Sequence, residues 1–216
     1  MNLLIVGAPG VGKGTMSRFL VAHYKLVHVS TGDMLREAIK EKTPVGLKAQ
    51  EYMSKGMLVP DEIIHDIIIE RLSKNDINRG FLFDGYPRTL AQAIDLSNIL
   101  NQLNKKIDGV LNLQLNDEII TKRITGRRTC PSCGSIFNVY YNKEKVDGVC
   151  DNCGSELVTR EDDNLESLKS RLEEFYKNTK PVVEYYDKQN IVFNINADQD
   201  KEAEFKDIQK VLEGLQ

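Results

Sequence analysis

Short apolar runs alternate with longer amphipathic stretches along this chain. Five runs have the length and composition of buried parallel strands, at residues 2–6, 26–29, 81–83, 110–115 and 191–195. Between two of them, residues 61–73 place isoleucine and leucine on one helical face and acidic side chains elsewhere, which is typical of a helix that faces a core. The alternation predicts an α/β fold with one five-stranded, doubly wound parallel sheet, whose ligand site lies beyond the carboxyl ends of the strands.

Two segments interrupt this alternation. Residues 30–59 contain two short helical patterns with no strand between them, so we expect a small helical insertion. Residues 126–163 contain all four cysteines and a β-prone run, which predicts a separate small β module, called here the cysteine module. A long helical pattern at residues 165–188 then returns the chain to the sheet.

Length and charge limit the classes of function. A chain of 216 residues suits one domain carrying insertions better than two equal domains. With 41% hydrophobic and 28% charged residues the composition is globular, which excludes a disordered or fibrous protein. The net charge of −3 provides no overall field to hold nucleic acid or an anionic membrane. The apolar opening is too short for a signal peptide or a membrane span, so we expect a cytoplasmic protein.

A glycine-rich loop follows the first predicted strand and precedes an amphipathic helix. We call residues 7–15 the phosphate loop; its candidate ligands are Gly10, Val11, Gly12, Lys13, Gly14 and Thr15. Glycines let the backbone N–H groups turn toward phosphate oxygens, and the helix N-terminus and the lysine add positive charge. This context predicts polyphosphate binding. The alternative is a glycine-rich turn with a surface lysine.

Asp84 ends the third predicted strand, where a carboxylate can hold Mg²⁺ through its water shell. The alternative is that Asp84 caps the following turn. His28 falls within a predicted strand, away from every motif, and we interpret it as a packed side chain with no catalytic role.

Two Cys-x2-Cys pairs lie within the cysteine module. Their four members are Cys130, Cys133, Cys150 and Cys153. The spacing matches a four-thiolate zinc ribbon, and a module this small needs a metal to hold it together. We therefore predict a structural zinc ion, with two disulfides as the alternative.

Arg123 and Arg127 fall four residues apart on a predicted helix, beside Lys122 and Arg128. Like charges at this spacing destabilise a helix by about 0.2 to 0.5 kcal/mol per pair, which an anion would relieve. A solvated basic face is the alternative.

Several motifs together resemble adenylate kinases of the bacterial type with a long, zinc-containing lid. They are GAPGVGKGT, STGDMLR, KGMLVPDE, DGYPRTLAQA, GRRTCPSCG, TREDDN and NINADQD. The resemblance implies a P-loop nucleoside monophosphate kinase fold and transfer of a phosphoryl group from MgATP to AMP, giving two ADP. It also implies a core of residues 1–29, 60–125 and 164–216, an AMP-binding insertion at 30–59 and a lid at 126–163.

The resemblance also implies roles for individual residues. Arg36 and Arg88 match the clamp on the AMP phosphate. Arg123, Arg127, Arg160 and Arg171 match the cluster around the transferred group and the ATP phosphates, and Arg123 and Arg127 are among the expected ATP contacts. With Lys13 and Asp84, four of these arginines form the expected catalytic set, namely Arg88, Arg123, Arg160 and Arg171. The remaining AMP contacts are Thr31, Met57, Val59, Gly85 and Gln92, joined by Arg160 and Arg171. The remaining ATP contacts are Ile136, Phe137 and Gln199.

Gln92 can be considered without the family. Its amide carries a donor and an acceptor, which matches the complementary edge of adenine, although a polar position on an amphipathic helix is the alternative interpretation.

Other functions remain as rivals. A GTP:AMP phosphotransferase is the nearest, because the base of the donor is recognised by loop backbone that the sequence does not define. A P-loop ATPase with a nucleic-acid-binding ribbon is disfavoured because the ribbon mixes lysines with acidic residues. A GTPase is disfavoured because the sequence contains no Asn-Lys-x-Asp motif. We expect a monomer that binds ATP, AMP and ADP, uses Mg²⁺ and zinc, and has no nucleic-acid or membrane partner.

Overall fold

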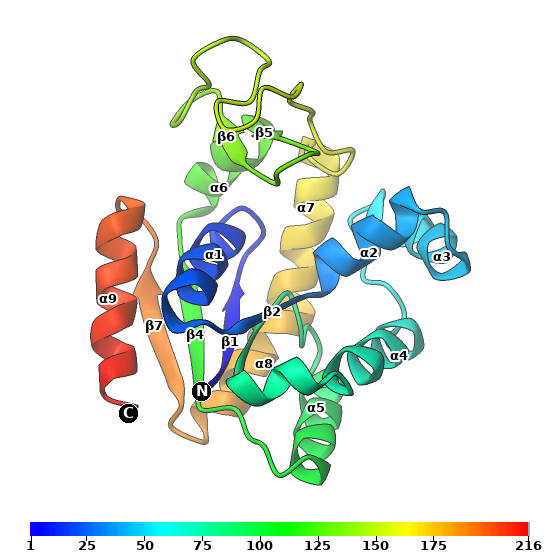
Figure 1. The fold of residues 1–216 in the computed structure, drawn as a ribbon, viewed down its shortest axis with the longest axis vertical. Helices are drawn as coiled ribbons and strands as arrows, with labels where there is room; N and C mark the ends of the chain where they lie inside the picture. Colours follow the sequence, from blue (N-terminus) through cyan, green and yellow to red (C-terminus); the bar gives the residue numbers. More distant parts are fainter. Residues whose placement is uncertain (216) are drawn as a thin grey trace.

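A computed structural model describes residues 1–215 as a parallel sheet flanked by helices (Figure 1). The strands of the sheet are β1 (Asn2–Gly7), β2 (Val27–Ser30), β3 (Phe81–Asp84), β4 (Gly109–Gln114) and β7 (Val192–Asn196). Neighbouring strands all pair in parallel, in the order β2-β3-β1-β4-β7. The predicted five-stranded sheet is confirmed, and each strand begins and ends within one residue of its expected position.

Helices connect and cover these strands. They are α1 (Lys13–Tyr24), α2 (Thr31–Lys40), α3 (Pro44–Met53), α4 (Asp61–Leu72), α5 (Leu90–Gln102), α6 (Asp117–Thr125), α7 (Leu165–Glu174), α8 (Lys180–Asp187) and α9 (Lys201–Glu213). A short 3-10 helix, η1 (Asn75–Arg79), precedes β3, and a π-helical segment, η2 (Phe175–Thr179), joins α7 to α8. None of the helices within residues 1–215 is long and apolar enough to cross a lipid bilayer.

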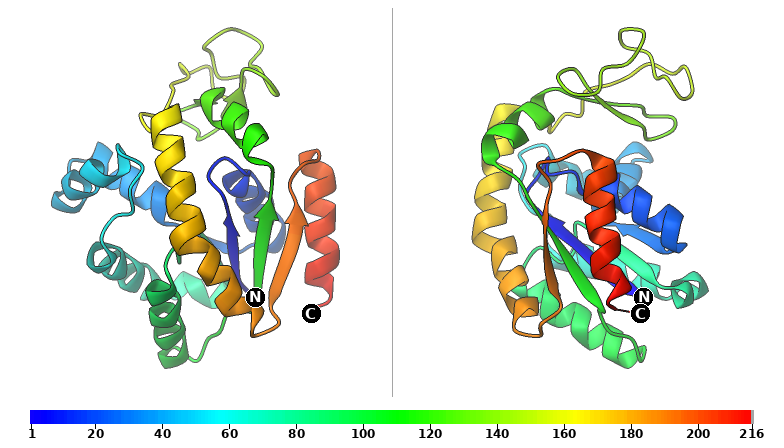
Figure 2. Two further views of the ribbon diagram at one scale, coloured as in Figure 1. Left: turned by 180° about the vertical axis from the view of Figure 1, so that it is seen from behind. Right: turned by 90° about the vertical axis from the view of Figure 1, so that its left-hand side faces the viewer.

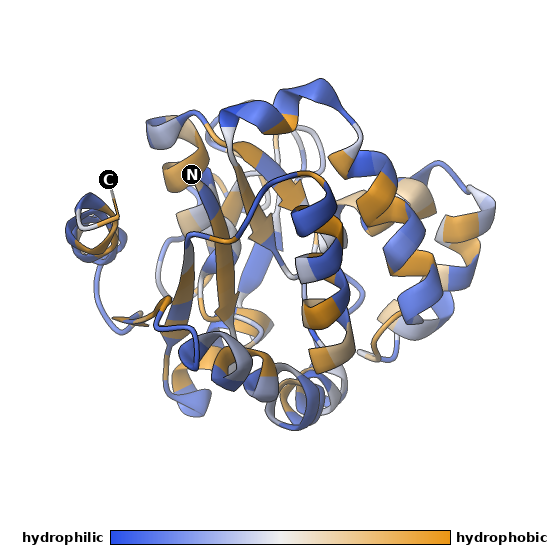
Figure 3. Ribbon diagram, turned by 90° about the horizontal axis from the view of Figure 1, so that it is seen from below, coloured by the Kyte–Doolittle hydropathy of each residue, from blue (hydrophilic) through white to orange (hydrophobic). Residues whose placement is uncertain are grey.

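Both faces of the central strands are buried, which explains why β1 and β3 are apolar over nearly their whole length, whereas the edge strand β7 leaves Asn194 and Asn196 exposed. In β1, Leu4 and Val6 pack on one face with α5 and α8, whereas Leu3 and Ile5 pack on the other with α1 and α9. Figure 2 shows α7 and α8 crossing the sheet on the side opposite α1. Figure 3 shows hydrophobic strands surrounded by helices whose hydrophilic parts face outward. The packing leaves the carboxyl ends of the strands available for the site.

The helical insertion consists of α2 and α3, which project from the sheet (Figure 1). Ser30 caps α2 and Thr43 caps α3, each accepting a backbone N–H bond within the first helical turn. The two helices approach so closely at Gly46 that a Cβ there would lie 2.1 Å from the carbonyl oxygen of Ala38. Only glycine permits this contact, so the expected pair of short helices is confirmed and packs as one unit.

The cysteine module lies above the sheet near α6 and α7 (Figure 1). Its regular structure is one antiparallel pair, β5 (Arg127–Thr129) and β6 (Ile136–Asn138). The buried core of the module holds Cys130, Phe137, Cys150 and Leu157. A core of this size is too small to stabilise a module alone, which agrees with the expected need for a metal or cross-link.

The expectation that Arg123 and Arg127 share one helix is wrong. Helix α6 ends at Thr125, and Arg127 begins β5. A Cβ on Gly126 would lie 2.6 Å from the ring of Tyr140, and the Asn138 side chain donates to the carbonyl of Arg123 at 2.9 Å. Packing of β6 and the residues after it therefore stops the helix, and the argument from like charges four residues apart on a helix does not apply.

Glu204 of α9 is buried in the core, with only 4% of its surface exposed. Its Oε1 atom has no hydrogen-bond partner among the described residues. Burial raises the pKa of Glu204 from 4.5 to about 7, although the positive charge of Arg123 opposes the shift. The folded state therefore holds a proton that the unfolded state has released between pH 4.5 and 7.

We expect Glu204→Gln to remove a pH-dependent loss of stability. Because the folded pKa is raised, the stabilising contribution is complete below pH 4.5 and is lost as the pH rises through about 7. Relative to Glu204→Gln, the wild type should lose on the order of 2 to 3 kcal/mol of unfolding free energy over this interval. Urea unfolding at pH 4.5 and pH 8 measures this difference. The exposed Glu202→Gln variant is the control, and parallel pH profiles for wild type and Glu204→Gln would contradict the prediction.

Candidate functional site

The phosphate loop leads from the end of β1 directly into α1, as the sequence predicts. Gly10 and Gly12 have φ angles of +79° and +119°, which side chains rarely tolerate. A Cβ on Gly10 would also lie 2.8 Å from the side chain of Ile124. Since Gly12 precedes α1 and offers no capping side chain, the first N–H groups of the helix remain available to an anion.

Lys13 lies at the start of α1 and turns back under the loop. Its Nζ atom donates to the carbonyl oxygens of Gly7 at 2.6 Å and Ala8 at 3.0 Å. The pKa of Lys13 is lowered to about 7, mainly because burial removes the ammonium from water. The Asp84 carboxylate opposes this shift, and the positive charges of nearby arginines, foremost Arg88, add to it. The lysine is thus held at the loop, in surroundings where an added anion would favour its charged form.

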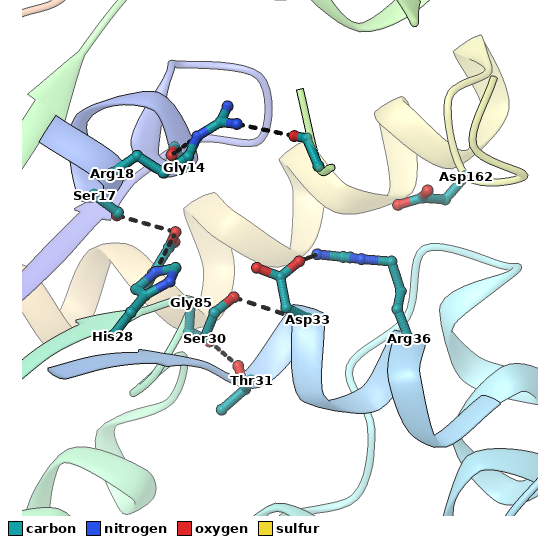
Figure 4. Close-up of polar contacts among 12 residues, drawn as sticks. Gly14, Ser17, Arg18, His28, Ser30, Thr31, Asp33, Arg36, Gly85 and Asp162 are labelled. Atoms are coloured by element: carbon teal, nitrogen blue, oxygen red, sulfur yellow. Dashed lines mark hydrogen bonds and ion pairs between the residues drawn. The ribbon is translucent and has the colours of Figure 1, made fainter. Parts of the chain in front are cut away.

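Asp84 ends β3 beside the phosphate loop. A Cβ on Gly14 would lie 3.8 Å from Asp84 Oδ2, and the buried Ser17 hydroxyl donates to the same oxygen at 3.1 Å. His28 Nε2 lies 3.6 Å from it (Figure 4). Burial alone would raise the pKa of Asp84, but His28 and Lys13 outweigh it, so its pKa lies below the usual value. A carboxylate kept ionised at this position is suited to holding a hydrated divalent cation.

Two adjoining hollows run from the helical insertion to the phosphate loop. The first is bounded by α2, and the second reaches Lys13. Arg88 and Arg171 line both hollows. Burial, together with the charge of Arg171, lowers the pKa of Arg88 to about 10, and burial also lowers the pKa of Arg171. Two guanidinium groups placed at one junction are arranged for phosphate groups that enter from both sides.

Three of the arginines expected in the site form ion pairs with aspartates. Arg36 pairs with Asp33 at 2.5 Å within α2, Arg171 pairs with Asp162 at 3.0 Å, and Arg127 pairs with the buried Asp163. Figure 4 shows Asp33 and Arg36 on α2, with Asp162 nearby on another segment. These pairs hold the guanidinium groups near the hollows.

The four cysteine thiols converge on one point. All four Sγ atoms lie within 4.8 Å of one another, and none of the four cysteines forms a disulfide. The two knuckles have the same hydrogen bonds: the N–H of Cys130 donates to Ser135 and that of Cys150 to Ser155, at 2.8 and 2.9 Å. This arrangement matches a four-thiolate metal centre rather than two disulfides.

Comparison with known proteins identifies the family. A family model described as adenylate kinase matches residues 5–191. The chain is 50% identical to an adenylate kinase of Geobacillus sp. (strain WCH70) over 216 residues, which covers all of both chains. It is 46% identical to an adenylate kinase of Archaeoglobus fulgidus and 45% identical to one of Bacillus subtilis (strain 168), each over 215 residues covering 100% of this chain and 99% of the relative.

The chain belongs to the adenylate kinase family. It is therefore a nucleoside monophosphate kinase, and the resemblance to adenylate kinases is confirmed. The cluster of four cysteines is consistent with the zinc-containing type of lid.

The residues expected to bind the acceptor nucleotide lie around the first hollow, with one exception. Those lining the first hollow are Thr31, Arg36, Met57, Val59, Gly85, Arg88, Gln92 and Arg171. The exception is Arg160, which does not line the first hollow. The pKa of Arg160 is lowered to about 10, mainly by burial, and the nearby charges of Arg127 and Arg36 add to this shift.

The residues expected to bind the donor are more scattered. Arg123 reaches the phosphate loop and donates to the carbonyl of Val11 at 2.8 Å, whereas Ile136, Phe137 and Gln199 line neither hollow. Phe137 is packed in the core of the cysteine module, and Gln199 donates to Asp207 at 3.1 Å. The structure thus brings Arg123, but not these three, to the phosphate loop.

Gln92 lies in the first hollow with its amide already engaged. Its Oε1 accepts the N–H of Arg88 at 2.7 Å, and its Nε2 donates to Asp61 at 2.5 Å. An amide oxygen has two lone pairs and an amide nitrogen two hydrogens, so one acceptor and one donor position remain for a base.

Sequence reasoning missed several residues of the site. The expectation that no histidine lies near a motif is wrong, because parallel pairing of β2 with β3 brings His28 beside Asp84. Ser17 could have been found, since it lies four residues after Lys13 on the same helix face. No local signal marked Asp162 and Asp163 as partners of arginines.

Proposed function

We propose that this adenylate kinase transfers the terminal phosphoryl group of MgATP to AMP and so forms two ADP. One observation carries the proposal: the two hollows adjoin, and Arg88 and Arg171 line both of them. A triphosphate entering from the phosphate loop and a monophosphate entering from α2 would meet at these two guanidinium groups. Phosphoryl transfer needs mainly positioning and charge neutralisation, which arginines supply.

The donor phosphates are assigned to the phosphate loop. The N–H groups at the start of α1 and the Lys13 ammonium would bind the β- and γ-phosphates. Arg123 would join them from α6, since its guanidinium already contacts the carbonyl of Val11. Arg127 and Arg160 complete this set when residues 126–163 close over the donor.

The acceptor is assigned to the first hollow. Arg36 and Arg88 would hold the AMP phosphate bidentately, and the free donor and acceptor positions of Gln92 would pair with adenine. Met57 and Val59 provide apolar contact beside the base. In this scheme the Arg36 guanidinium pairs with Asp33 when AMP is absent and with the AMP phosphate when it is bound, so its charge is paired in both states.

Mg²⁺ bound with ATP neutralises phosphate charge during transfer. The chain offers hard oxygen ligands of the kind this cation prefers, namely the ionised Asp84 and the hydroxyl of Thr15. Asp84 would hold the hydrated ion, and Ser17 would fix the orientation of its carboxylate.

The cysteine module is assigned a structural zinc ion held by Cys130, Cys133, Cys150 and Cys153. The close approach of four soft sulfur donors supports the assignment, and four protein ligands leave no open position for a reaction. Zinc would supply folding energy that the small core of the module lacks.

We assign the core to residues 1–29, 60–125 and 164 onward, with 30–59 as the AMP-binding insertion and 126–163 as the lid. Closure of both would exclude water and so protect the phosphoryl group from hydrolysis. Because Asp162 and Asp163 pair with Arg171 and Arg127, closure would exchange these carboxylates for phosphate. We assign a cytoplasmic monomer.

A nucleic-acid-binding role for the cysteine module is less well supported. Its lysines are mixed with acidic residues, and Lys143 pairs with Asp147 at 3.4 Å, so no continuous basic face forms.

The decisive assay mixes ATP and AMP with Mg²⁺ and follows ADP. We expect two ADP per AMP consumed, little ATP hydrolysis when AMP is omitted, and slower turnover when GTP replaces ATP. Equal hydrolysis of ATP with and without AMP would instead indicate an ATPase. Faster turnover with GTP would identify GTP as the preferred donor. A reaction that contains both ATP and GTP measures this preference directly.

A further inference from the structure

The helix that carries Arg171 changes its winding before it reaches the end of the sheet. Residues 175–179 form the π-helical segment η2, in which the N–H of Lys180 donates to the carbonyl of Phe175, five residues earlier. Pro181 follows directly. Proline has no N–H, and its ring clashes with the carbonyl four residues earlier in an α-helix, so wider winding just before it relieves the clash.

Thr179 follows this change of winding and lies against the loop that carries Arg88. Thr179 is the last residue of η2 and is 8% exposed. A helical threonine commonly bonds to a carbonyl of its own preceding turn. Here Oγ1 instead donates to the carbonyl oxygen of Arg88 at 2.9 Å, across 91 positions of the chain. Both residues line the second hollow.

Arg88 lies in the loop between β3 and α5, where no ladder or helix bonds hold its backbone. Side chains hold it from both sides. Its N–H donates to Gln92 Oε1 at 2.7 Å, and its carbonyl accepts the Thr179 hydroxyl. Its Nε donates to the carbonyl of Gly85 at 2.8 Å. Because Arg171 lies near and repels it, Arg88 needs such restraint to keep its guanidinium at the junction of the two hollows.

We propose that Thr179 is a positioning residue for Arg88 and thereby a determinant of AMP affinity. One helix then places both guanidinium groups of the junction, Arg171 directly and Arg88 through the Thr179 hydroxyl. The inference rests on the proposed role of Arg88 as a ligand of the AMP phosphate. Thr179 also lines the second hollow with Lys13, but its hydroxyl bonds to Arg88 and to none of the described residues of the phosphate loop.

The test compares Thr179→Val, which removes the hydroxyl and keeps the shape, with Thr179→Ser, which keeps the hydroxyl. We expect Thr179→Val to raise the KM and the calorimetric Kd for AMP about tenfold, with the KM for ATP within about twofold of wild type. Thr179→Ser should restore the AMP values. Thr121→Val is the matched control, because the Thr121 hydroxyl bonds only within its own helix, to Asp117 at 2.9 Å.

The outcomes separate the inference from the function on which it rests. An unchanged KM for AMP in Thr179→Val, equal increases for AMP and ATP, or failure of Thr179→Ser to restore affinity would each overturn the role of Thr179. If Thr179→Val does not fold, Thr179→Ala is measured against Thr179→Ser by the same criteria. Arg88→Ala serves as a reference: normal AMP affinity in that variant would reject the role of Arg88, and absence of ADP formation by the wild type would reject the proposed reaction.

Discussion

Lys13→Ala is expected to lower kcat by about 10³-fold, the range seen when a positioned positive group is removed from a phosphoryl-transfer site. Lys13 turns under the phosphate loop, and its Nζ bonds only to two loop carbonyls, those of Gly7 and Ala8. An anion bound there would be neutralised by this ammonium, so most of the loss should appear in the transition state, where the transferred group develops charge.

The fold should tolerate this change. The Lys13 side chain is not part of the buried apolar core, so its removal opens no apolar cavity and withdraws only the ammonium from the carbonyls of the buried Gly7 and Ala8. Steady-state kinetics gives kcat, and thermal melting should show a midpoint close to that of the wild type. Lys25→Ala, an exposed lysine directly after α1, is the control and should retain full activity. A Lys13→Ala enzyme within tenfold of wild type would remove the phosphate loop from the proposed mechanism.

Removal of the metal is expected to have the largest effect on stability. Four sulfur atoms within 4.8 Å of one another, around a core of four buried residues, leave the cysteine module dependent on ligation. A strong chelator, or Cys153→Ser, should lower the melting temperature by about 5 to 10 °C, which corresponds to several kcal/mol for a chain of this size. Limited proteolysis should then cleave first within residues 126–163.

Two measurements make this result specific. Mass spectrometry of the native protein should find one zinc ion per chain, which chelation removes. Ser132→Ala, an exposed position inside the first knuckle, should leave both the metal content and the melting temperature unchanged. If the native protein contains no zinc, and its melting temperature is the same before and after treatment with the chelator, the four thiols have another role.

Local patterns in the sequence were sufficient for the framework of this protein. The central strands β1 and β3 are apolar over nearly their whole length because both of their faces are covered, so hydrophobicity alone located them. The phosphate loop and the paired cysteines could also be identified from local sequence motifs. Their chemistry depends on residues that are neighbours in the chain, such as Gly12 beside Lys13 or Cys130 near Cys133.

Contacts between distant segments could be found only in the tertiary structure. The sequence predicts Arg127 on the helix of Arg123, four residues away, whereas the packing of Tyr140 against Gly126 ends that helix. Likewise, His28 lies beside Asp84 only because β2 pairs with β3 in the sheet.

The sequence by itself determined the parallel sheet, the phosphate loop, the paired cysteines and the family, since each is encoded over a short stretch or repeated at a fixed spacing. The tertiary structure decided how the arginines are held. The carbonyl of Arg88 accepts a hydrogen bond from Thr179, 91 positions away, and the guanidinium of Arg127 donates to Asp163, 36 positions away. The physical reason is that a side-chain hydrogen bond or ion pair needs its two groups about 3 Å apart, and only the packed backbone brings such distant positions together.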